Sequence, residues 1–333
     1  MVIDRINIDG YARIMHVTDD DSGLDAFIVV HSTKLGPAIG GVRCYEYKTE
    51  EDQLNDALRL SRGMTFKNAA AGLDHGGAKT TVNASKIKNR KTAFQILGKA
   101  VNLLDGSYIC AGDVGTTTDD LYCINDRTSY VAGIKLDSSH PTALGVYTSI
   151  ETLLSRDHIL HNSASFTVQG MGKVGFKLAN MLIEDGCTVS AYDPYTKVFD
   201  YYNNSHLNIE QLSEHDVVTN DAIMYVPCAL GAVLNMKSLN KLKSRYVCGS
   251  ANNIFATTND VGIAHNLGFK YVPDFIANCG GVVAVALDFQ KKDYTKALTI
   301  DLHNRINEIL DIATYEGTPA QTVAERFANE RLK

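Results

Sequence analysis

The sequence predicts an α/β protein of two domains, the second built on a doubly wound parallel sheet. Three observations lead to this fold class. The chain has 333 residues, more than a single domain of ordinary size. After residue 165, short apolar strands alternate with helical segments, a pattern typical of a parallel sheet covered by helices. A glycine-rich turn joins the first of these strands to the helix that follows it.

The composition is that of a folded protein with no nucleic-acid or membrane function. Hydrophobic residues make up 45% and charged residues 21% of the chain, so it can bury a large core. The 32 Lys and Arg residues against 38 Asp and Glu residues give a net charge of −6, which argues against nucleic acid or an anionic membrane as a partner. Seven widely spaced cysteines without a CxxC pair indicate neither disulfides nor a metal site. No segment has the length of a membrane helix or the pattern of a signal peptide, so we expect a cytoplasmic protein.

The first half of the chain mixes strands and helices. Two strand-like runs within residues 11–31 flank the turn DDDSG and predict a hairpin. Residues 49–64 have apolar positions at helical spacing behind a capping threonine, which predicts a helix. A strand at 78–84, a second helix at 91–104 and a strand at 107–111 follow on the same criteria.

A polar run that ends in a proline marks a crossover near Ser138. We therefore expect a first domain of residues 1–138 plus 315–333 and a second domain of residues 139–314. The second domain should contain five strands, at 165–169, 188–193, 222–228, 245–250 and 269–274. The last stretches, 281–315 and 319–331, have the composition of helices.

The turn after the strand at 165–169 has the GxGxxG pattern of a Rossmann-type dinucleotide site. Gly170 permits the tight turn, Gly172 lets the backbone approach a pyrophosphate, and Gly175 allows the helix to pack closely on the strand. Asp193 ends the next strand, 18 residues after Gly175, which is near the spacing expected for an acid that binds the ribose hydroxyls. A carboxylate there would repel a 2′-phosphate, so the expected cofactor is NAD and not NADP.

Two lysines of the first half have unusual neighbours. Lys67 and Lys79 stand beside small or apolar residues instead of in a solvated charge run. A buried lysine with a second cation nearby has a lowered pKa and can act as a general base. On composition alone, a partly buried structural lysine remains the alternative for both.

Several motifs occur in one order along nearly the whole chain: GPAIGG, DALRLSRGMTFKNAAAGL, GGAK, DVGTT, the GxGxxG segment, PCALGAVLN, GSANN and NCGGV. With these motifs the chain resembles the family of glutamate, leucine, phenylalanine and valine dehydrogenases, and within it the leucine dehydrogenase branch. The resemblance implies an N-terminal α/β domain for substrate binding and oligomerisation, followed by the Rossmann-type NAD-binding domain. It also implies a homo-oligomer, a dimer or larger.

The resemblance implies the reversible oxidative deamination of an L-amino acid to a 2-oxo acid and ammonia. Lys67, in the GMTFK motif, would hold the substrate carboxylate. Lys79, in the GGAK motif, would activate the water that attacks the imino carbon. Asp113, in the DVGT motif, would carry protons at the substrate nitrogen. No metal is implied.

The remaining expected site residues are carried by motif position. An apolar side-chain pocket, which favours a branched aliphatic substrate and disfavours glutamate, is expected from Ile39, Ala111, Val282 and Val285. An aromatic substrate such as phenylalanine or tryptophan stays open, because the sequence does not give the cavity volume. Close to the substrate we also expect Met64, Gly40 and Gly41. Close to the cofactor we expect Lys173, Val174, Cys228, Ala229, Asn253, Asn278 and Thr142.

Two positions depart from the family pattern. Ala78 precedes Lys79 where a glycine is usual, and Gly112 precedes Asp113 where a glutamate is usual. Without a carboxylate beside the site, the negative electrostatic potential that favours protonated groups is lost. The pH optimum or the turnover can therefore differ from that of other family members. These departures leave a second hypothesis open: a non-catalytic, NAD-binding homologue.

Overall fold

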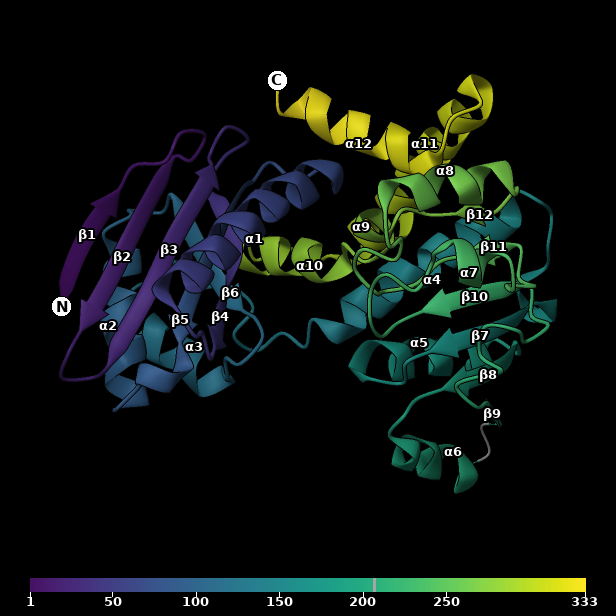
Figure 1. Cartoon of the computed structure of the whole chain (residues 1–333), viewed down its shortest axis with the longest axis horizontal. Coiled ribbons are helices and arrows are strands. Elements are labelled where there is room, and N and C mark those ends of the chain that lie inside the picture. The colour runs from purple at the N-terminus through teal and green to yellow at the C-terminus, as the bar shows by residue number, and fades with distance from the viewer. Residues whose placement is uncertain (206–207) are drawn as a thin grey trace. The chain divides into compact units, whose positions relative to one another are not determined.

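A computed structural model describes residues 1–205 and 208–333 (Figure 1). The chain divides into two compact units. Unit 1 consists of Met1–Asp137, Val282–Asp293 and Phe327–Lys333, and unit 2 of Ser138–Gly281 and Tyr294–Arg326. Within the described residues, no helix is both long enough and apolar enough to cross a membrane.

Unit 1 is built on a six-stranded mixed sheet. Its order is β1 (Val2–Ile6), β2 (Arg13–Asp19), β3 (Leu24–Ser32), β5 (Gly76–Asn83), β4 (Ala38–Tyr45) and β6 (Tyr108–Gly112). The pairs from β1 to β5 are antiparallel, whereas β4 runs parallel to both β5 and β6. The expected hairpin is therefore formed by β2 and β3, and β1 adds an edge strand.

Helices cover both faces of this sheet, because the apolar residues of β3 are consecutive and point in turn to opposite faces. Phe27 and Val29 of β3 pack with α1 (Glu50–Ala70), whereas Ile28 and Val30 pack on the other face with α2 (Arg90–Asn102). This period of two buries both sides of a central strand. Helix α3 (Thr118–Asn125) lies beside α2.

Strand β4 was not predicted, because glycines are depleted in strands. In the structure its glycines are needed where backbones approach closely. A Cβ atom on Gly40 would lie 1.7 Å from the carbonyl oxygen of Ala78 in the neighbouring strand β5. The two glycines therefore fit a crowded central strand that side chains at these positions would distort.

Helix α1 begins as expected and ends later than expected. Thr49 caps it by accepting a hydrogen bond from the backbone N–H of Asp52 at 3.0 Å. The helix continues past residue 64 to Ala70, so that Lys67 lies in its last turn and not in a loop. The extension is possible because Gly77 of β5 leaves room for the helix backbone at Thr65.

Unit 2 contains a six-stranded parallel sheet flanked by helices (Figure 1). Its strand order is β12 (Lys270–Tyr271), β11 (Tyr246–Val247), β10 (Met224–Pro227), β7 (Ser165–Gln169), β8 (Thr188–Tyr192) and β9 (Glu210–Gln211). The order reverses between β7 and β10, and ligands of such sheets bind at the carboxyl ends of the strands at this point. The helices of unit 2 include α4 (Ser139–Ser155), α5 (Lys173–Glu184), α8 (Thr258–Asn266) and α11 (Leu302–Glu316).

The division of the chain differs from the expected one in its C-terminal part. Helix α10 (Gly280–Phe289) begins in unit 2, but from Val282 onward it belongs to unit 1. Val285 and Ala286 pack with Ile39 in one apolar cluster, which accounts for this assignment. The segment that was expected to be helical from 281 to 315 is interrupted before a π-helical turn at Ala297–Asp301 and α11.

The return to unit 1 at the C-terminus also comes later than residue 315. Helix α12 (Ala320–Arg331) starts in unit 2, and only Phe327–Lys333 belong to unit 1. Arg331 fixes this end by donating hydrogen bonds to the carbonyl oxygen of Ala69 at 3.0 Å and to the carboxylate of Asp74 at 2.7 Å.

Candidate active site

A buried lysine and an aspartate form an ion pair in unit 1. Lys79 lies in β5 and Asp113 directly follows β6, the two strands on either side of β4. The Nζ atom of Lys79 is 2.6 Å from Oδ2 of Asp113. The side chain of Lys79 is only 7% exposed and that of Asp113 is 22% exposed. The sheet order brings together two residues that are far apart in the sequence.

The surroundings of the pair alter both pKa values. Burial lowers the pKa of Lys79, and the positive charge of Arg43 lowers it further, whereas Asp113 offsets only part of this effect. Burial alone would raise the pKa of Asp113, but the ammonium of Lys79 and the guanidinium of Arg43 outweigh it, so the pKa is below its ordinary value. The aspartate is thus held ionised beside a lysine that loses its proton more easily than a solvated one.

Arg43, in β4, is a member of this site that the sequence reasoning missed. Its Nε donates a hydrogen bond to Oδ2 of Asp113 at 3.1 Å, and its Nη1 donates one to Oδ2 of Asp56 at 3.1 Å. Asp56 also accepts a hydrogen bond from the hydroxyl of Tyr47 at 2.9 Å. The available signal was the strand period, because Arg43 follows Gly41 by two residues and so lies on the same face of β4.

Gly41 makes room for Asp113. A Cβ atom at Gly41 would lie 2.7 Å from Cβ of Asp113 and 3.0 Å from the carbonyl oxygen of Gly112. Any side chain at this position would push Asp113 away from Lys79. Gly41 thus has a steric role beside Asp113, in addition to the expected approach of a substrate to its backbone.

The turn after Asp113 is fixed from two directions. Thr116 accepts a hydrogen bond from the backbone N–H of Asp113 at 2.9 Å. Gly115 has a φ of +78°, which favours glycine, and a Cβ atom there would lie 1.8 Å from the carbonyl oxygen of Cys44. Arg90 donates a hydrogen bond to the carbonyl oxygen of Gly115 at 2.7 Å while it forms an ion pair with Asp120. These contacts hold the turn that presents Asp113.

The expected substrate-binding residues of unit 1 lie on several elements. Lys67 and Met64 are half-buried on α1, the helix that packs on β5. Ala111 is buried in β6, two residues before Asp113. The structure places Ile39 and Val285 in one apolar cluster, whereas Val282 is half-buried at the start of the α10 segment that belongs to unit 1. The other members of this cluster are Leu73, Ile109, Ala132, Ala286 and Phe289.

The glycine-rich turn of unit 2 is crowded at two of its three glycines. Gly170 has a φ of +101°, and a Cβ atom on it would lie 2.6 Å from Cβ of Ala229. A Cβ atom on Gly175 would lie 2.0 Å from the carbonyl oxygen of Gly170, whereas one on Gly172 would meet nothing within 4 Å. Protein atoms thus fill the space beside Gly170 and Gly175, whereas the space beside Gly172 is open. Gly172 directly precedes α5, and Lys173 and Val174 lie in the first turn of this helix.

Asp193 lies beside this turn, at the carboxyl end of β8. Its Oδ2 accepts a hydrogen bond from the backbone N–H of Met171 at 2.7 Å, and its Oδ1 accepts one from the backbone N–H of Tyr195 at 2.8 Å. Cys228 joins the same edge through a hydrogen bond from its backbone N–H to the carbonyl oxygen of Gln169 at 2.7 Å. The observed residues therefore fit a dinucleotide at the point where the strand order reverses.

Three further expected residues also belong to unit 2. Asn253 has a φ of +52°, and its backbone N–H donates a hydrogen bond to Asp274 at 2.7 Å. Asn278 donates a hydrogen bond to Oδ1 of Asn252 at 2.9 Å. Thr142, near the start of α4, donates a hydrogen bond to the carbonyl oxygen of Ser138 at 2.7 Å. In the described part of the chain, no group of three or more His, Cys, Asp and Glu side chains is arranged to hold a metal ion.

Both parts of the chain are similar to known amino-acid dehydrogenases. Residues 12–130 match the family model "Glu/Leu/Phe/Val dehydrogenase, dimerisation domain", and residues 133–316 match "Glutamate/Leucine/Phenylalanine/Valine dehydrogenase". A leucine dehydrogenase of Bacillus subtilis is 36% identical, covering 97% of this chain and 92% of that protein. A phenylalanine dehydrogenase of Lysinibacillus sphaericus is 33% identical, covering 98% and 90%. The crystal structure of an L-tryptophan dehydrogenase from Nostoc punctiforme superposes with a TM-score of 0.82 at 28% identity, covering 97% and 96%.

Proposed function

Because the chain belongs to the glutamate/leucine/phenylalanine/valine dehydrogenase family, we propose that it oxidatively deaminates a branched-chain aliphatic L-amino acid. The enzyme class is that of the NAD-dependent amino-acid dehydrogenases. The reaction converts the L-amino acid, water and NAD⁺ into the 2-oxo acid, ammonium, NADH and a proton. The observation that carries the proposal is the buried ion pair of Lys79 and Asp113.

We assign the proton chemistry to this pair. NAD, held by the residues of the glycine-rich turn, would supply the acceptor for the hydride of the substrate α-carbon, so that the substrate would become an imine. Nζ of Lys79, whose pKa is lowered by burial, takes a proton from the water that attacks the imino carbon. The carboxylate of Asp113 takes and returns protons at the substrate nitrogen, and its low pKa keeps it ionised for an ammonium group. Lys67 is the cation proposed to bind the substrate carboxylate, and Gly40 and Gly41 allow the substrate to approach the backbone.

We propose that unit 1 binds the amino acid and unit 2 binds NAD. The residues proposed to hold the pyrophosphate are the glycines at the amino end of α5 together with Lys173 and Val174, and Asp193 is proposed to bind the ribose hydroxyls. The open space at Gly172 and the position of Asp193 beside the turn support this assignment. Thr142, Cys228, Ala229, Asn253 and Asn278 are proposed as further cofactor contacts.

The proposed substrate class rests on the apolar cluster around Ile39 and Val285. Aliphatic side chains favour a branched aliphatic substrate through burial, at roughly 0.8 kcal/mol for each buried methylene. They offer no hydrogen-bond partner to a second carboxylate, so glutamate is disfavoured. Phenylalanine is the second candidate, because relatives named leucine and phenylalanine dehydrogenases match this chain at similar identity.

A panel of amino acids tests the proposal. With saturating NAD, we expect kcat/KM for L-leucine or L-valine to exceed that for L-phenylalanine and L-tryptophan by about tenfold or more, because one or two methylenes of misfit cost about 1–3 kcal/mol. The measurement is the rate of NADH formation at alkaline pH. A preference for the aromatic substrates would overturn the aliphatic assignment. No turnover on any amino acid, with NAD still bound, would favour a non-catalytic homologue.

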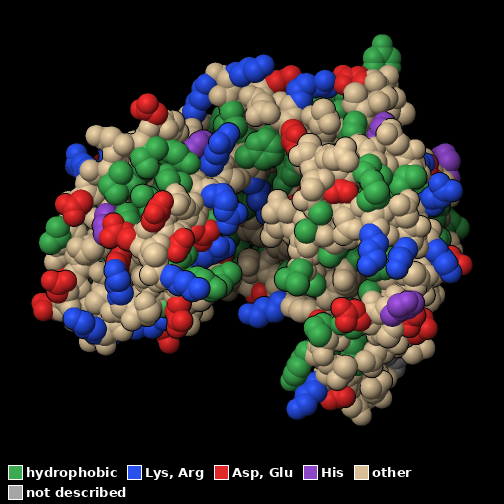
Figure 2. Space-filling view, in the orientation of Figure 1, with side chains coloured by type: hydrophobic (Ala, Val, Ile, Leu, Met, Phe, Trp, Pro, Cys, Tyr) green, Lys and Arg blue, Asp and Glu red, His purple; other side chains and the backbone are tan. Residues whose placement is uncertain are grey.

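We further propose that a second copy of the chain packs on the N-terminal sheet. The residues 12–130 match a family model described as a dimerisation domain. Figure 2 shows hydrophobic side chains gathered on the N-terminal sheet, near the loop between β1 and β2. The half-buried members of the apolar cluster there are Ile6, Ile8, Tyr11, Leu54 and Leu58.

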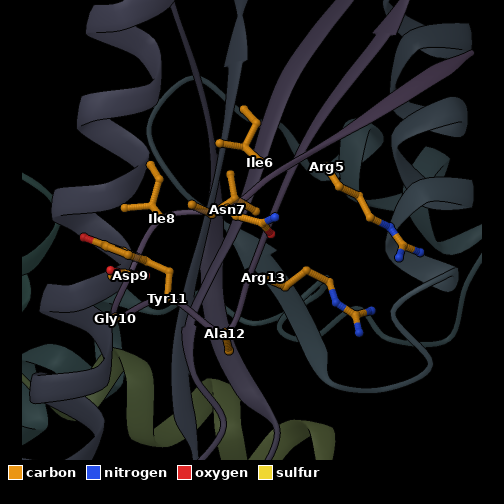
Figure 3. Close-up of a pocket in the computed structure, with 10 residues that line it drawn as sticks. Arg5, Ile6, Asn7, Ile8, Asp9, Gly10, Tyr11, Ala12 and Arg13 are labelled. Carbon is orange, nitrogen blue, oxygen red and sulfur yellow. The ribbon is translucent and has the colours of Figure 1, made fainter.

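The same loop borders a pocket formed by residues 5–14 (Figure 3). Figure 3 shows Arg5 and Arg13 on one side of it and Ile8 and Tyr11 on the other. This pocket contains none of the residues assigned to catalysis or to NAD. Arg5 and Arg13 alternate with Ile6 and Ile14 along β1 and β2, so these exposed arginines point to the face of the sheet opposite the apolar patch.

The oligomer proposal predicts a change in assembly for Leu58→Glu. A carboxylate in the patch would have to be desolvated in the interface, so we expect this variant to shift toward the monomer. Molar mass by light scattering measures the effect. Leu103→Glu is the control, because Leu103 is 61% exposed at the end of α2, away from the patch. An unchanged mass for Leu58→Glu would exclude this surface as the interface.

The cysteines support a reducing compartment. All seven are free thiols in the structure, as is usual in the cytoplasm. We therefore propose a cytoplasmic enzyme.

A further inference from the structure

We propose that Arg43 is a positioning residue of the catalytic centre. Its guanidinium holds the carboxylate of Asp113 in place and weakens the electrostatic attraction between this carboxylate and the ammonium of Lys79. This inference rests on the proposed roles of Lys79 and Asp113. It assigns to Arg43 the task of keeping Lys79 able to release its proton while Asp113 stays ionised.

The geometry of the shared oxygen supports this role. Oδ2 of Asp113 contacts both Nζ of Lys79, at 2.6 Å, and Nε of Arg43, at 3.1 Å. An aspartate paired with a single buried lysine would stabilise the ammonium form and oppose its action as a base. With two cations on one oxygen, part of the carboxylate's charge is compensated by a group that never releases its proton.

Arg43 is itself held in place by a second carboxylate. Its Nη1 donates a hydrogen bond to Asp56 of α1 at 3.1 Å, and the hydroxyl of Tyr47 donates one to the same oxygen of Asp56 at 2.9 Å. The guanidinium is thus fixed between two carboxylates from different elements, with its side chain 23% exposed. A fixed cation of this kind sets the position of Asp113 independently of whether Lys79 carries a proton.

The charges around Lys79 also support this role of Arg43. The groups that act on it come from three elements: Asp113 after β6, Arg43 on β4 and Asp56 on α1. Asp113 and Asp56 raise the pKa of Lys79, whereas Arg43 lowers it and acts in the same direction as burial. Without Arg43, the two carboxylates would raise the pKa of Lys79 without the opposing positive charge of Arg43.

The test is the pH dependence of kcat for Arg43→Gln with a saturating amino acid and NAD. Because Lys79 must be unprotonated to act as the base, the rate rises with pH through its pKa. Removal of the guanidinium should move the midpoint of this rise to higher pH by about one unit, which is a loss of about tenfold in rate below the midpoint. The KM for the amino acid should stay unchanged. Arg43→Lys keeps the positive charge and should return the midpoint toward that of the unaltered enzyme.

A matched control and a second variant complete the experiment. Arg59→Gln removes an exposed arginine that also pairs with Asp56 but lies outside the contact with Asp113, and its pH profile should overlay that of the unaltered enzyme. If Arg43→Gln does not fold, the double variant Arg43→Gln/Asp56→Asn is used in its place. It removes one positive and one negative charge, so the midpoint of the pH profile should move in the same direction by a smaller amount.

Two results would overturn the inference, and they are distinguishable. A rate for Arg43→Gln that falls by the same factor at every pH, with an unmoved midpoint, would make Arg43 a purely structural residue while the roles of Lys79 and Asp113 stand. Full activity of Lys79→Ala would overturn the proposed chemistry itself, and with it the role of Arg43.

Discussion

Replacement of Lys79 by alanine is expected to lower kcat by a factor of about 10² to 10⁴, the usual contribution of a general base. Binding of NAD should be unchanged, because Lys79 belongs to unit 1 and the glycine-rich turn to unit 2. The fold should persist, because Asp113 keeps its ion pair with Arg43 when Lys79 is removed. The measurements are the rate of NADH formation with the preferred amino acid and the affinity for NAD by calorimetry.

Lys86→Ala is the control for this experiment. Lys86 is a lysine of the same unit that also pairs with an aspartate, Asp25, but its side chain is 52% exposed. The loss of Lys86 should leave kcat within about twofold, because Lys86 contacts none of the residues assigned to the reaction and the buried Asp25 keeps its hydrogen bond with His16. Equal activities of the Lys79→Ala and Lys86→Ala variants would remove Lys79 from the reaction.

The second large effect is expected from Gly77→Ala. A Cβ atom on Gly77 would lie 2.0 Å from the backbone nitrogen of Thr65 and 2.5 Å from its Cα, so α1 would have to move away from β5. Overpacking of this kind should lower the free energy of unfolding by about 3 kcal/mol. Turnover should fall as well, because the displaced elements carry Lys67 and Lys79. Urea unfolding, followed by its midpoint and slope, measures the loss of stability.

Gly63→Ala tests the same substitution on the exposed side of α1. A Cβ atom on Gly63 would meet nothing within 4 Å, and alanine is favoured over glycine within a helix by roughly 0.5–1 kcal/mol. This variant should therefore be slightly more stable than the unaltered protein and equally active. If Gly77→Ala were as stable as Gly63→Ala, the close approach of α1 to β5 would not be a constraint on the fold.

Local signals in the sequence predicted most of the elements and the family. The strand, turn and helix at residues 165–184 were predicted because the glycines and the apolar positions lie within one short segment, and the capping threonine of α1 was predicted for the same reason. Two features could not be predicted, because the local residue pattern indicates a different structure or because the decisive residue lies on another element. Strand β4 contains two glycines, which are unfavourable in strands unless neighbouring backbones come as close as they do here. The end of α1 was placed too early, because the room that Gly77 leaves for it belongs to a different element.

The sequence by itself determined the two-domain α/β fold, the glycine-rich turn with Asp193 beside it and, through the order of its motifs, the dehydrogenase family. Only the tertiary structure decided that Lys79 and Asp113 share a buried ion pair and that Arg43 and Asp56 complete it. The physical reason is that spacing along the chain sets local conformation, whereas these side chains come from three strands and a helix. Their distances depend on the order of the strands, in which β4 lies between β5 and β6, and no short segment of the sequence encodes that order.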